Sequence, residues 1–311
     1  MNNKERQSVK AEVTKREEIP LSHTALSDNY WKDTIRKMFK KKAAVVGLLI
    51  FATICLSCAL APVLTRWEYD HIDSMKVFEK PSRLHILGTD SYGRDVFSRL
   101  LYGGRVTLLI TLVSTIVAAI IGSALGIISG YFGKRAEIII TPVLDAMASI
   151  PVIFLALVFE VVLGWGQGFF IYAIIIASIP NFARIVCAST MNTMGKEYIE
   201  AAKALGLGHL DIIFKHVLHH TVPPLIVGFT SRLSDAFLTC TIMGYLEVGI
   251  RPPIPEWGQI IFLSKTSVLL NPQLMIFPCA LVVLTVISIS LIGDSIRDIL
   301  DPWEKDDSLN N

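Results

Sequence analysis

Long runs of apolar residues, rather than an alternation of apolar and polar positions, dominate this sequence. The run from Ala43 to Leu64 holds 22 residues without a charged side chain, and the run from Val106 to Gly133 holds 28. A helix of about 20 apolar residues crosses the hydrocarbon core of a bilayer, and it satisfies its own backbone hydrogen bonds there. The pattern predicts an all-α membrane protein with about six transmembrane helices, at 43–64, 106–130, 138–163, 169–190, 222–246 and 273–293.

Two of the predicted spans carry local signals. Pro142 and Pro151 should bend or interrupt the third span, because proline removes a helical hydrogen bond. In the second span small residues recur every four positions, which places them on one helix face and favours close packing against another helix. The alternative is that glycine is simply common in membrane helices. The four residues are Ala118, Gly122, Gly126 and Gly130.

The distribution of Lys and Arg predicts the orientation of the chain. Residues 1–42 carry 11 of them, and Lys134 and Arg135 occupy the second connection, so both segments are expected in the cytoplasm. The connection at 164–168 has none and is expected outside, whereas the basic connection at 191–221 is expected inside. The long 65–105 loop has seven Lys or Arg and six Asp or Glu, and gives the weakest support. Both chain ends are then cytoplasmic.

These spans divide the chain into four parts. We expect a basic tail at 1–42, an anchor helix with an outer loop at 43–105, a transmembrane domain at 106–293 and a C-terminal tail at 294–311. Residues 29–40 fit a short interfacial helix as well as they fit a flexible tail, and residues 1–25 are expected to be disordered.

Composition agrees with a membrane protein. Hydrophobic residues make up 52% and charged residues 18% of the chain, against about 25% charged in soluble domains. The net charge of +2 provides no basic field for a nucleic-acid partner. The five cysteines lie in or at the ends of predicted spans, so no disulfide framework follows. The pair Cys55-x-x-Cys58 sits in an apolar helix and is interpreted as packing.

A few charged residues fall inside the predicted spans, where each costs about 2.5–3.5 kcal/mol at a helix centre. Asp145 therefore needs a partner or a water-filled cavity. Arg232 and Asp235 are three residues apart on one helix and can pair locally. Two interpretations stay open for these residues: a polar translocation path or gate, and internal pairing that orients the helices.

The connection at 191–221 is the most informative segment. Residues 197–205 are good helix formers, and Gly206 is well placed as the left-handed residue that ends a helix. A second short helix is expected at 210–218, before Pro223-Pro224. Such a helix–turn–helix suits either contact with a soluble partner or packing on its own bundle.

Here the chain resembles a family: the permease subunits of binding-protein-dependent ABC importers, in their dipeptide, oligopeptide and nickel branch. The resemblance covers roughly 40–303, and five motifs in order carry it. They are Glu200-Ala201-Ala202-x-x-x-Gly206, Leu87-Gly88-Thr89-Asp90-x-x-Gly93-Arg94-Asp95-Val96-Phe97-Ser98-Arg99, Asp145-x-x-x-x-x-Pro151, Pro252-Pro253-x-Pro255-x-Trp257-Gly258 and Gly293-Asp294-x-x-Arg297-Asp298-x-Leu300-Asp301-Pro302.

The sequence departs from the family pattern at two places. His219 stands where the signature loop usually has proline, and Pro223-Pro224 are expected to end the helix instead. The usual Gly-Leu-Gly near the outer end of the fifth helix reads Leu246-Glu247-Val248-Gly249. Glu247 is a candidate contact for a cationic substrate or a docking protein, with a solvated helix end as the alternative.

The resemblance implies a type I ABC importer permease fold with a cytoplasmic coupling helix, in a prokaryotic cell membrane. Its implied partners are a second homologous permease in a heterodimer, two cytoplasmic ATPases that bind ATP and Mg, an external solute-binding protein and membrane lipid. No cofactor is expected in this chain. The substrate is expected to be a di- or oligopeptide, with nickel or a metal chelate as the alternative. The coupling residues would be Glu197, Tyr198, Glu200, Ala201, Ala202, Leu205 and Gly206, and the path or gate candidates Asp145, Arg232, Asp235 and Glu247.

Other functions find less support in the residues. The sequence has no Gly-x-x-x-x-Gly-Lys-Ser/Thr phosphate loop. The histidines at 209, 216, 219 and 220 lie on the inner connection, the wrong side for substrate entry, so no metal site is expected. An ion-driven secondary transporter would show inverted repeats, which are not evident. A membrane enzyme would need facing polar residues, and Asp145 and Glu160 are too few.

Overall fold

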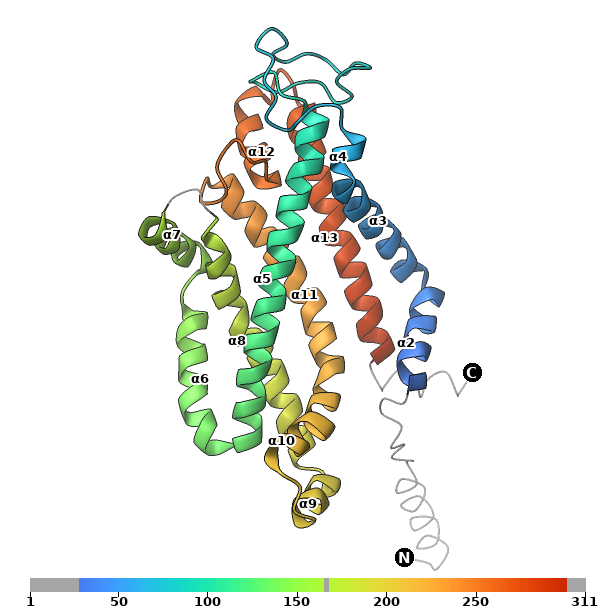
Figure 1. Ribbon diagram of the computed structural model, residues 1–311, viewed down its shortest axis with the longest axis vertical. Helices are drawn as coiled ribbons and strands as arrows, with labels where there is room; N and C mark the ends of the chain where they lie inside the picture. Colours follow the sequence, from blue (N-terminus) through green and yellow to red (C-terminus); the bar gives the residue numbers. More distant parts are fainter. Residues whose placement is uncertain (1–27, 165–167, 301–311) are drawn as a thin grey trace, which may run out of the picture. The chain divides into compact units, whose positions relative to one another are not determined.

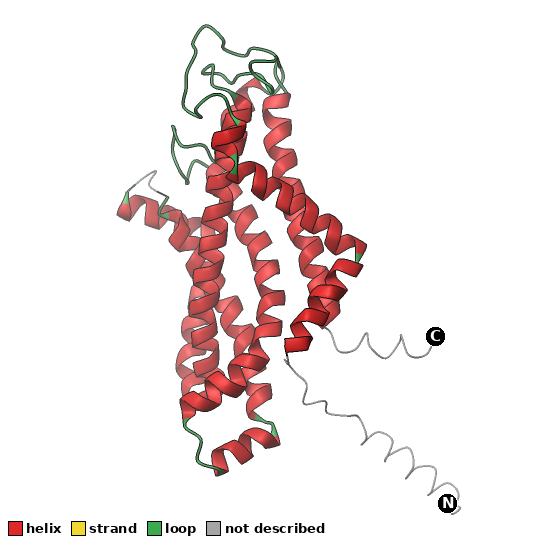
Figure 2. Ribbon diagram, turned by 45° about the vertical axis from the view of Figure 1, so that its right-hand side comes forward, coloured by secondary structure: helices red, strands yellow, loops and turns green. Residues whose placement is uncertain are grey.

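The computed structural model describes residues 28–164 and 168–300, and helices account for nearly all of its regular structure, with no strand in these ranges (Figure 2). The chain forms two compact units, Met1–Arg36 and Lys37–Asn311. Helix α2 (Asp28–Lys40) matches the short helix expected at 29–40. The disorder expected for 1–25 lies outside the described residues.

The second unit confirms the predicted fold class of a helical membrane protein. Five helices of the described part are long and apolar enough to cross a membrane, and a bent pair makes a sixth candidate. The five are α3 (Lys42–Ala59), α5 (Val96–Phe132), α8 (Phe170–Met194), the continuous helix His209–Tyr245 and α13 (Gln273–Leu300). The bent pair is α6 (Lys134–Ser149) with α7 (Val152–Leu163), and the shorter helices are α4 (Ala61–Leu64), α9 (Glu197–Ala204) and α12 (Trp257–Ser264).

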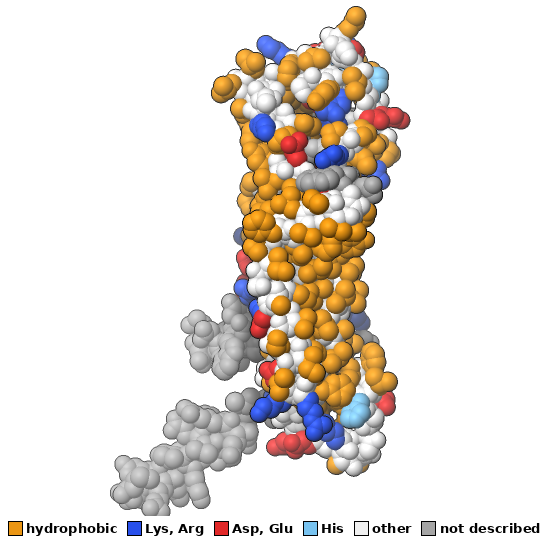
Figure 3. All heavy atoms as spheres, turned by 90° about the vertical axis from the view of Figure 1, so that its left-hand side faces the viewer, with side chains coloured by type: hydrophobic (Ala, Val, Ile, Leu, Met, Phe, Trp, Pro, Cys, Tyr) orange, Lys and Arg blue, Asp and Glu red, His pale blue; other side chains and the backbone are white. Residues whose placement is uncertain are grey.

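Within this unit the long helices lie side by side (Figure 1). Helices α9 and α10 (His209–Ile212) occupy one end of the bundle, here named the α9 end. The 65–95 segment and α12 occupy the other, here named the loop end. The connections expected on one side of the membrane, at 134–135 and 191–221, both lie at the α9 end. On the face of Figure 3, apolar side chains cover the middle and charged side chains gather towards both ends, as expected for a chain that spans a bilayer.

The small-residue face of α5 packs directly on α8, which confirms a helix interface. A Cβ at Gly126 would lie 2.5 Å from the carbonyl oxygen of Ala183, and one at Gly122 would lie 2.6 Å from Cβ of Phe182. Gly130 meets Thr190 in the same way. Only residues without a side chain allow the two backbones this close approach.

The third predicted span, 138–163, is not one helix. It breaks after Ser149, and α6 and α7 meet at 85°. Ile150 is extended (φ −87°, ψ 120°) because the ring of the following Pro151 disfavours the helical conformation of the residue before it. Pro142 lies inside α6 without breaking it. The prediction that proline interrupts this span holds for Pro151 alone.

The helix expected to end before Pro223-Pro224 instead continues through them. Helix α10 passes into a π turn, Ile213–Val217, and then into α11 (Leu218–Tyr245), which contains both prolines. Pro224 has no N–H to donate to the carbonyl of His220 four residues earlier. The hydroxyl of Ser189 on α8 donates to that carbonyl at 3.2 Å. A serine of a neighbouring helix thus replaces the bond that proline removes.

Replacing Ser189 with alanine should therefore destabilise the protein by about 1 kcal/mol, because the His220 carbonyl loses its donor. In a Pro224→Ala background the backbone N–H at 224 restores the bond, and the same change should cost much less. Unfolding of the four proteins in detergent, followed by circular dichroism, measures this coupling. Equal losses in both backgrounds would show that the serine does not compensate for the proline.

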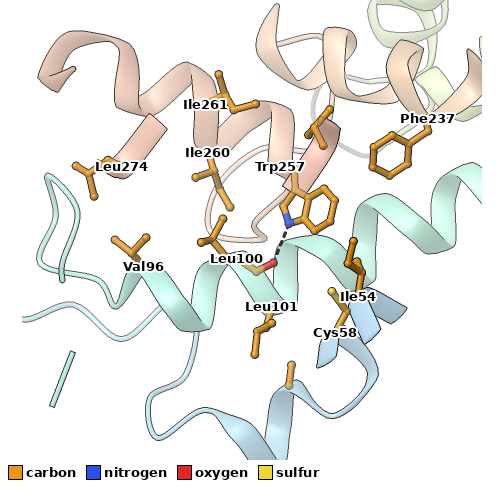
Figure 4. Close-up of a cluster of buried hydrophobic side chains, with 12 residues drawn as sticks. Ile54, Cys58, Val96, Leu100, Leu101, Phe237, Trp257, Ile260, Ile261 and Leu274 are labelled. Carbon is orange, nitrogen blue, oxygen red and sulfur yellow. Dashed lines mark hydrogen bonds between the residues drawn. The ribbon is translucent and has the colours of Figure 1, made fainter. Parts of the chain in front are cut away.

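The core at the loop end is centred on Trp257 (Figure 4). This side chain is fully buried, and its indole N–H donates to the carbonyl of Leu100 on α5 at 2.8 Å. Phe237 of α11 meets its ring edge to face, with centroids 5.8 Å apart. Cys58 belongs to the same cluster, and it and Cys55 are both free thiols. The core thus ties α3, α5, α11 and α12 together.

Candidate functional site

Helix α9 is a short helix mounted firmly on the end of the bundle. Ile199 is fully buried and Ala202 is 7% exposed. Ile199 packs in a cluster with Tyr131 of α5, Val186 of α8 and Val217 of the π turn. This cluster joins the buried face of α9 to the end of the bundle.

The end of α9 follows from Gly206. The N–H of Gly206 donates to the Lys203 carbonyl at 3.0 Å, and the N–H of Leu207 donates to the Ala202 carbonyl at 3.2 Å. These two bonds are the Schellman pattern, which needs a left-handed residue between them. Gly206 has φ +81°, as predicted. The observed helix, Glu197–Ala204, also agrees with the predicted 197–205.

The opposite face of α9 points away from the bundle. Glu197, Glu200 and Ala201 are exposed, and no ion pair of the described part involves either glutamate. Large apolar side chains in the residues that follow are also exposed: Leu205, Leu210 and Phe214 are 81%, 70% and 66% exposed. Leu205 directly follows α9, and an exposed apolar side chain close to exposed carboxylates is typical of a protein-binding surface.

Tyr198 and the histidines lie behind this surface. The Tyr198 ring lies 6.0 Å from the rings of His216 and His220, and burial raises the pKa of its phenol. Tyr131 is hydrogen bonded to Nδ1 of His209 at 2.8 Å. In the described ranges no three histidine, cysteine or acidic side chains converge as metal ligands. Because its ring packs against His216 and His220, Tyr198 faces its own chain, whereas Glu200 is exposed.

The charged residues within the spans include two ion pairs, and Glu160 of α7 is fully buried and accepts from the N–H of Phe170 at 3.2 Å. Asp145 of α6 contacts Arg184 of α8 at 2.7 Å, with the two side chains 58% and 54% exposed. Arg232 and Asp235 pair locally on α11 at 2.9 Å. At 1.5 Å per residue, Asp145 lies about 17 Å from the first residue of α6, and Arg232 lies about 35 Å from the start of the continuous helix at His209. Charged pairs at this depth do not face hydrocarbon without a large cost.

Glu247 follows the end of α11 and has φ +60°, unusual for a residue with a side chain. It lines a cavity of about 410 Å³ at the loop end together with Arg251 and Gln259. The sequence placed Glu247 near the outer end of the fifth helix. No sequence pattern indicated that Arg251 and Gln259 would line the cavity, because their positions there depend on the fold of the 246–252 turn and on the packing of α12.

A buried polar network at the loop end, which sequence reasoning missed, organises the motifs before α5 and around Trp257. Asp95 caps α5 by accepting from the N–H of Ser98 at 2.7 Å, and His85 contacts its other oxygen at 2.9 Å. Arg99 is buried and donates to the carbonyl of Tyr69 at 3.2 Å. The signal was present in the spacing Gly-Arg-Asp-x-x-Ser, which is a helix N-cap.

Glu256 caps α12 from inside this network. It is 1% exposed and accepts from the N–H groups of Gly258 and Gln259, each at 3.0 Å. The Thr107 hydroxyl lies 3.1 Å from the carboxyl and also 3.0 Å from the Gly103 carbonyl. Burial, only partly offset by these hydrogen bonds, raises the pKa of Glu256 to about 7.

The Glu256 carboxyl should make the free energy of unfolding depend on pH. Between the ordinary value of 4.5 and about 7, the folded state binds more protons than the unfolded state. The contribution of Glu256 to the free energy of unfolding is therefore complete below pH 4.5. It falls by about 3 kcal/mol as the pH rises through 7. Glu256→Gln should remove this contribution to the slope. Unfolding in detergent at pH 5 to 8 measures it, and an unchanged slope in the variant would contradict the assignment.

The fold defines a multi-pass helical membrane protein with five candidate spans in the described ranges, or six if the bent pair α6–α7 counts as one, and with a short, partly exposed helix at one end. The family model described as binding-protein-dependent transport system inner membrane component matches residues 122–306. A second, the N-terminal TM domain of oligopeptide transport permease C, matches 29–81. The chain belongs to the family of binding-protein-dependent transport permeases, and the predicted resemblance is confirmed.

Curated relatives agree over nearly the whole chain. The dipeptide transport system permease of Alkalihalophilus pseudofirmus is 35% identical, over 91% of this chain and 92% of its own length. A glutathione transport permease of Pectobacterium atrosepticum is 33% identical, covering 88% and 91%. The oligopeptide transport permease of Bacillus subtilis is 30% identical, covering 88% and 89%.

A solved structure shows the same fold. The inward-facing MetNI methionine ABC transporter matches with a TM-score of 0.51 at 23% identity, over 64% of this chain and 95% of that one. The type I importer permease fold, predicted from the sequence, is confirmed by this similarity.

Proposed function

We propose that this chain is one of two permease subunits of an ATP-driven importer of di- or oligopeptides. The relatives named for dipeptide, oligopeptide and glutathione transport support the peptide class. The observation that carries the proposal is α9, a capped helix with one face fixed to the bundle and the other exposed.

In this proposal the α9 end faces the cytoplasm, in keeping with the Lys and Arg distribution, and both chain ends lie on that side. The exposed face of α9 docks on a cytoplasmic ATPase that binds ATP and Mg, and a second ATPase serves a homologous partner permease. Because Ile199 and Tyr198 pack on other elements, movement of the ATPase would be transmitted to α5, α8 and α11 as a rigid-body motion.

The loop end then faces an external solute-binding protein. Peptide would pass between the two permeases, along faces that carry Asp145, Arg232 and Asp235, after entering near Glu247. ATP hydrolysis by the partner ATPases would supply the energy and drive alternating access, since this chain has no phosphate loop of its own.

Co-purification and transport together test the proposal. A tagged chain purified from its native host should bring down an ATPase subunit and a second permease, and vesicles with the complex should take up peptide only with ATP and the binding protein. Uptake by the chain alone under an ion gradient would contradict it. Uptake of a nickel or metal-chelate complex instead of peptide would retain the mechanism and reject the substrate class.

A further inference from the structure

Helix α2 ends one residue before a candidate spanning helix. Lys41 alone separates it from α3, which begins at Lys42. The backbone of Lys41 is extended (φ −78°, ψ 114°), so α2 and α3 do not form one continuous helix. The ammonium group of Lys41 contacts Asp298, in the last turn of α13, at 2.9 Å. Because the candidate spans α3 and α13 both have an end here, the last residues of α2 lie at the membrane boundary.

One side of the C-terminal half of α2 is apolar and exposed. Ile35 and Phe39 are four residues apart, which places them on the same side of the helix. They are 52% and 57% exposed. At 1.5 Å per residue along α2, both lie within roughly 10 Å of Lys42, the first residue of the span. This distance suits a helix that lies on the membrane, because such helices sink their apolar side about 5–10 Å into the boundary between headgroups and acyl chains.

The rest of α2 is basic. Four exposed Lys or Arg side chains stand against two acidic residues, Asp28 and Asp33. Lys37 and Lys40 lie opposite the apolar side at 3.6 residues per turn, and the other two flank it. None of the four belongs to an ion pair of the described residues, whereas Lys41 is paired with Asp298. Unpaired basic side chains around an apolar strip are typical of a helix on an anionic membrane surface. The four are Lys32, Arg36, Lys37 and Lys40.

We propose that α2 lies in the plane of the membrane and binds the phosphate groups of anionic phospholipids. Ile35 and Phe39 enter the acyl boundary, and the four basic side chains contact lipid phosphates. Each basic side chain near an anionic surface strengthens such attachment roughly fivefold. A lipid surface fits better than a protein partner, because the covalent link to α3 keeps α2 at the bilayer. The proposal rests on α2 and the spans, and not on the proposed transport function.

The test measures how far water reaches each side of α2 in the full chain. The five native cysteines are replaced, and a single cysteine carries a fluorophore at Ile35→Cys or, as the control on the opposite side, at Lys37→Cys. The chain is placed in nanodiscs of phosphatidylcholine with or without phosphatidylglycerol. Acrylamide, a neutral quencher that stays in water, then reports the exposure of the label.

With phosphatidylglycerol present, quenching should be roughly fivefold weaker at residue 35 than at residue 37, and most of this difference should disappear in phosphatidylcholine alone. Arg36→Gln with Lys40→Gln should raise quenching at residue 35 at least threefold. The matched pair Lys203→Gln with Lys215→Gln, which removes two exposed charges elsewhere, should leave it unchanged.

Three results would overturn the proposal. Equal quenching at residues 35 and 37 with phosphatidylglycerol present would place α2 in water or against a protein surface on both sides. Equal protection of residue 35 in the two lipid mixtures would show that lipid charge is not recognised. Unchanged protection after removal of Arg36 and Lys40 would show that the basic side chains do not bind the lipid.

Discussion

Replacing Gly126 with leucine should remove most of the folded protein from the membrane. The first atom of any side chain there would lie 2.5 Å from the Ala183 carbonyl oxygen and 2.9 Å from Cβ of Val186. Both neighbours belong to α8 and are fully buried, so neither can move aside. Overpacking of this kind costs more than about 3 kcal/mol, a large part of a typical folding free energy of about 5–15 kcal/mol.

Gly195→Ala is the matched control, because the nearest atoms to a Cβ there are 3.8 Å away. We expect its yield and unfolding temperature to equal those of the unaltered chain. Gly126→Leu should give aggregated protein, or an unfolding temperature lower by roughly 10 °C or more. Normal yield and stability of Gly126→Leu would show that α5 and α8 do not pack as closely as the structure shows.

The second large effect is expected at the end of α9. Proline at 206 fixes φ near −65°, where Gly206 has +81°, and it removes the N–H that donates to Lys203. The turn that orients α9 would be lost while the spanning helices remain intact. Under the proposed function, Gly206→Pro should lower peptide uptake at least tenfold at normal membrane levels and leave ATP hydrolysis running without transport.

Two further variants separate the effect of the backbone conformation at residue 206 from the effect of the exposed surface of α9. Gly206→Asn should keep most of the uptake, because asparagine tolerates the left-handed conformation. Glu200→Arg keeps the helix but reverses the charge of an exposed side chain, and should uncouple uptake as well. Unimpaired uptake by Gly206→Pro at matched protein level would remove α9 from the coupling role.

Features set by neighbouring residues were predictable from the sequence. Uncharged runs predicted the spans, and a row of helix formers before Gly206 predicted α9 and its cap. The path after Ile150 was only half predictable: Pro151 signals a break, but the 85° bend depends on what α7 packs against.

Features that depend on distant residues were not predictable. The helix passes Pro224 because a serine 31 residues from His220 supplies the missing bond. Asp145 meets Arg184 39 residues away. Glu256 and Thr107 are 149 residues apart. In each case a polar group was visible in the sequence, and its partner was defined only by the packing of the helices.

The most direct test of the coupling role is the side of the membrane on which residue 200 lies. A Glu200→Cys chain, with the five native cysteines replaced, is exposed to a membrane-impermeant maleimide. The account predicts no labelling in intact cells, labelling in inverted vesicles, and protection there when the ATPase subunit is bound. Labelling of residue 200 from outside intact cells would contradict it.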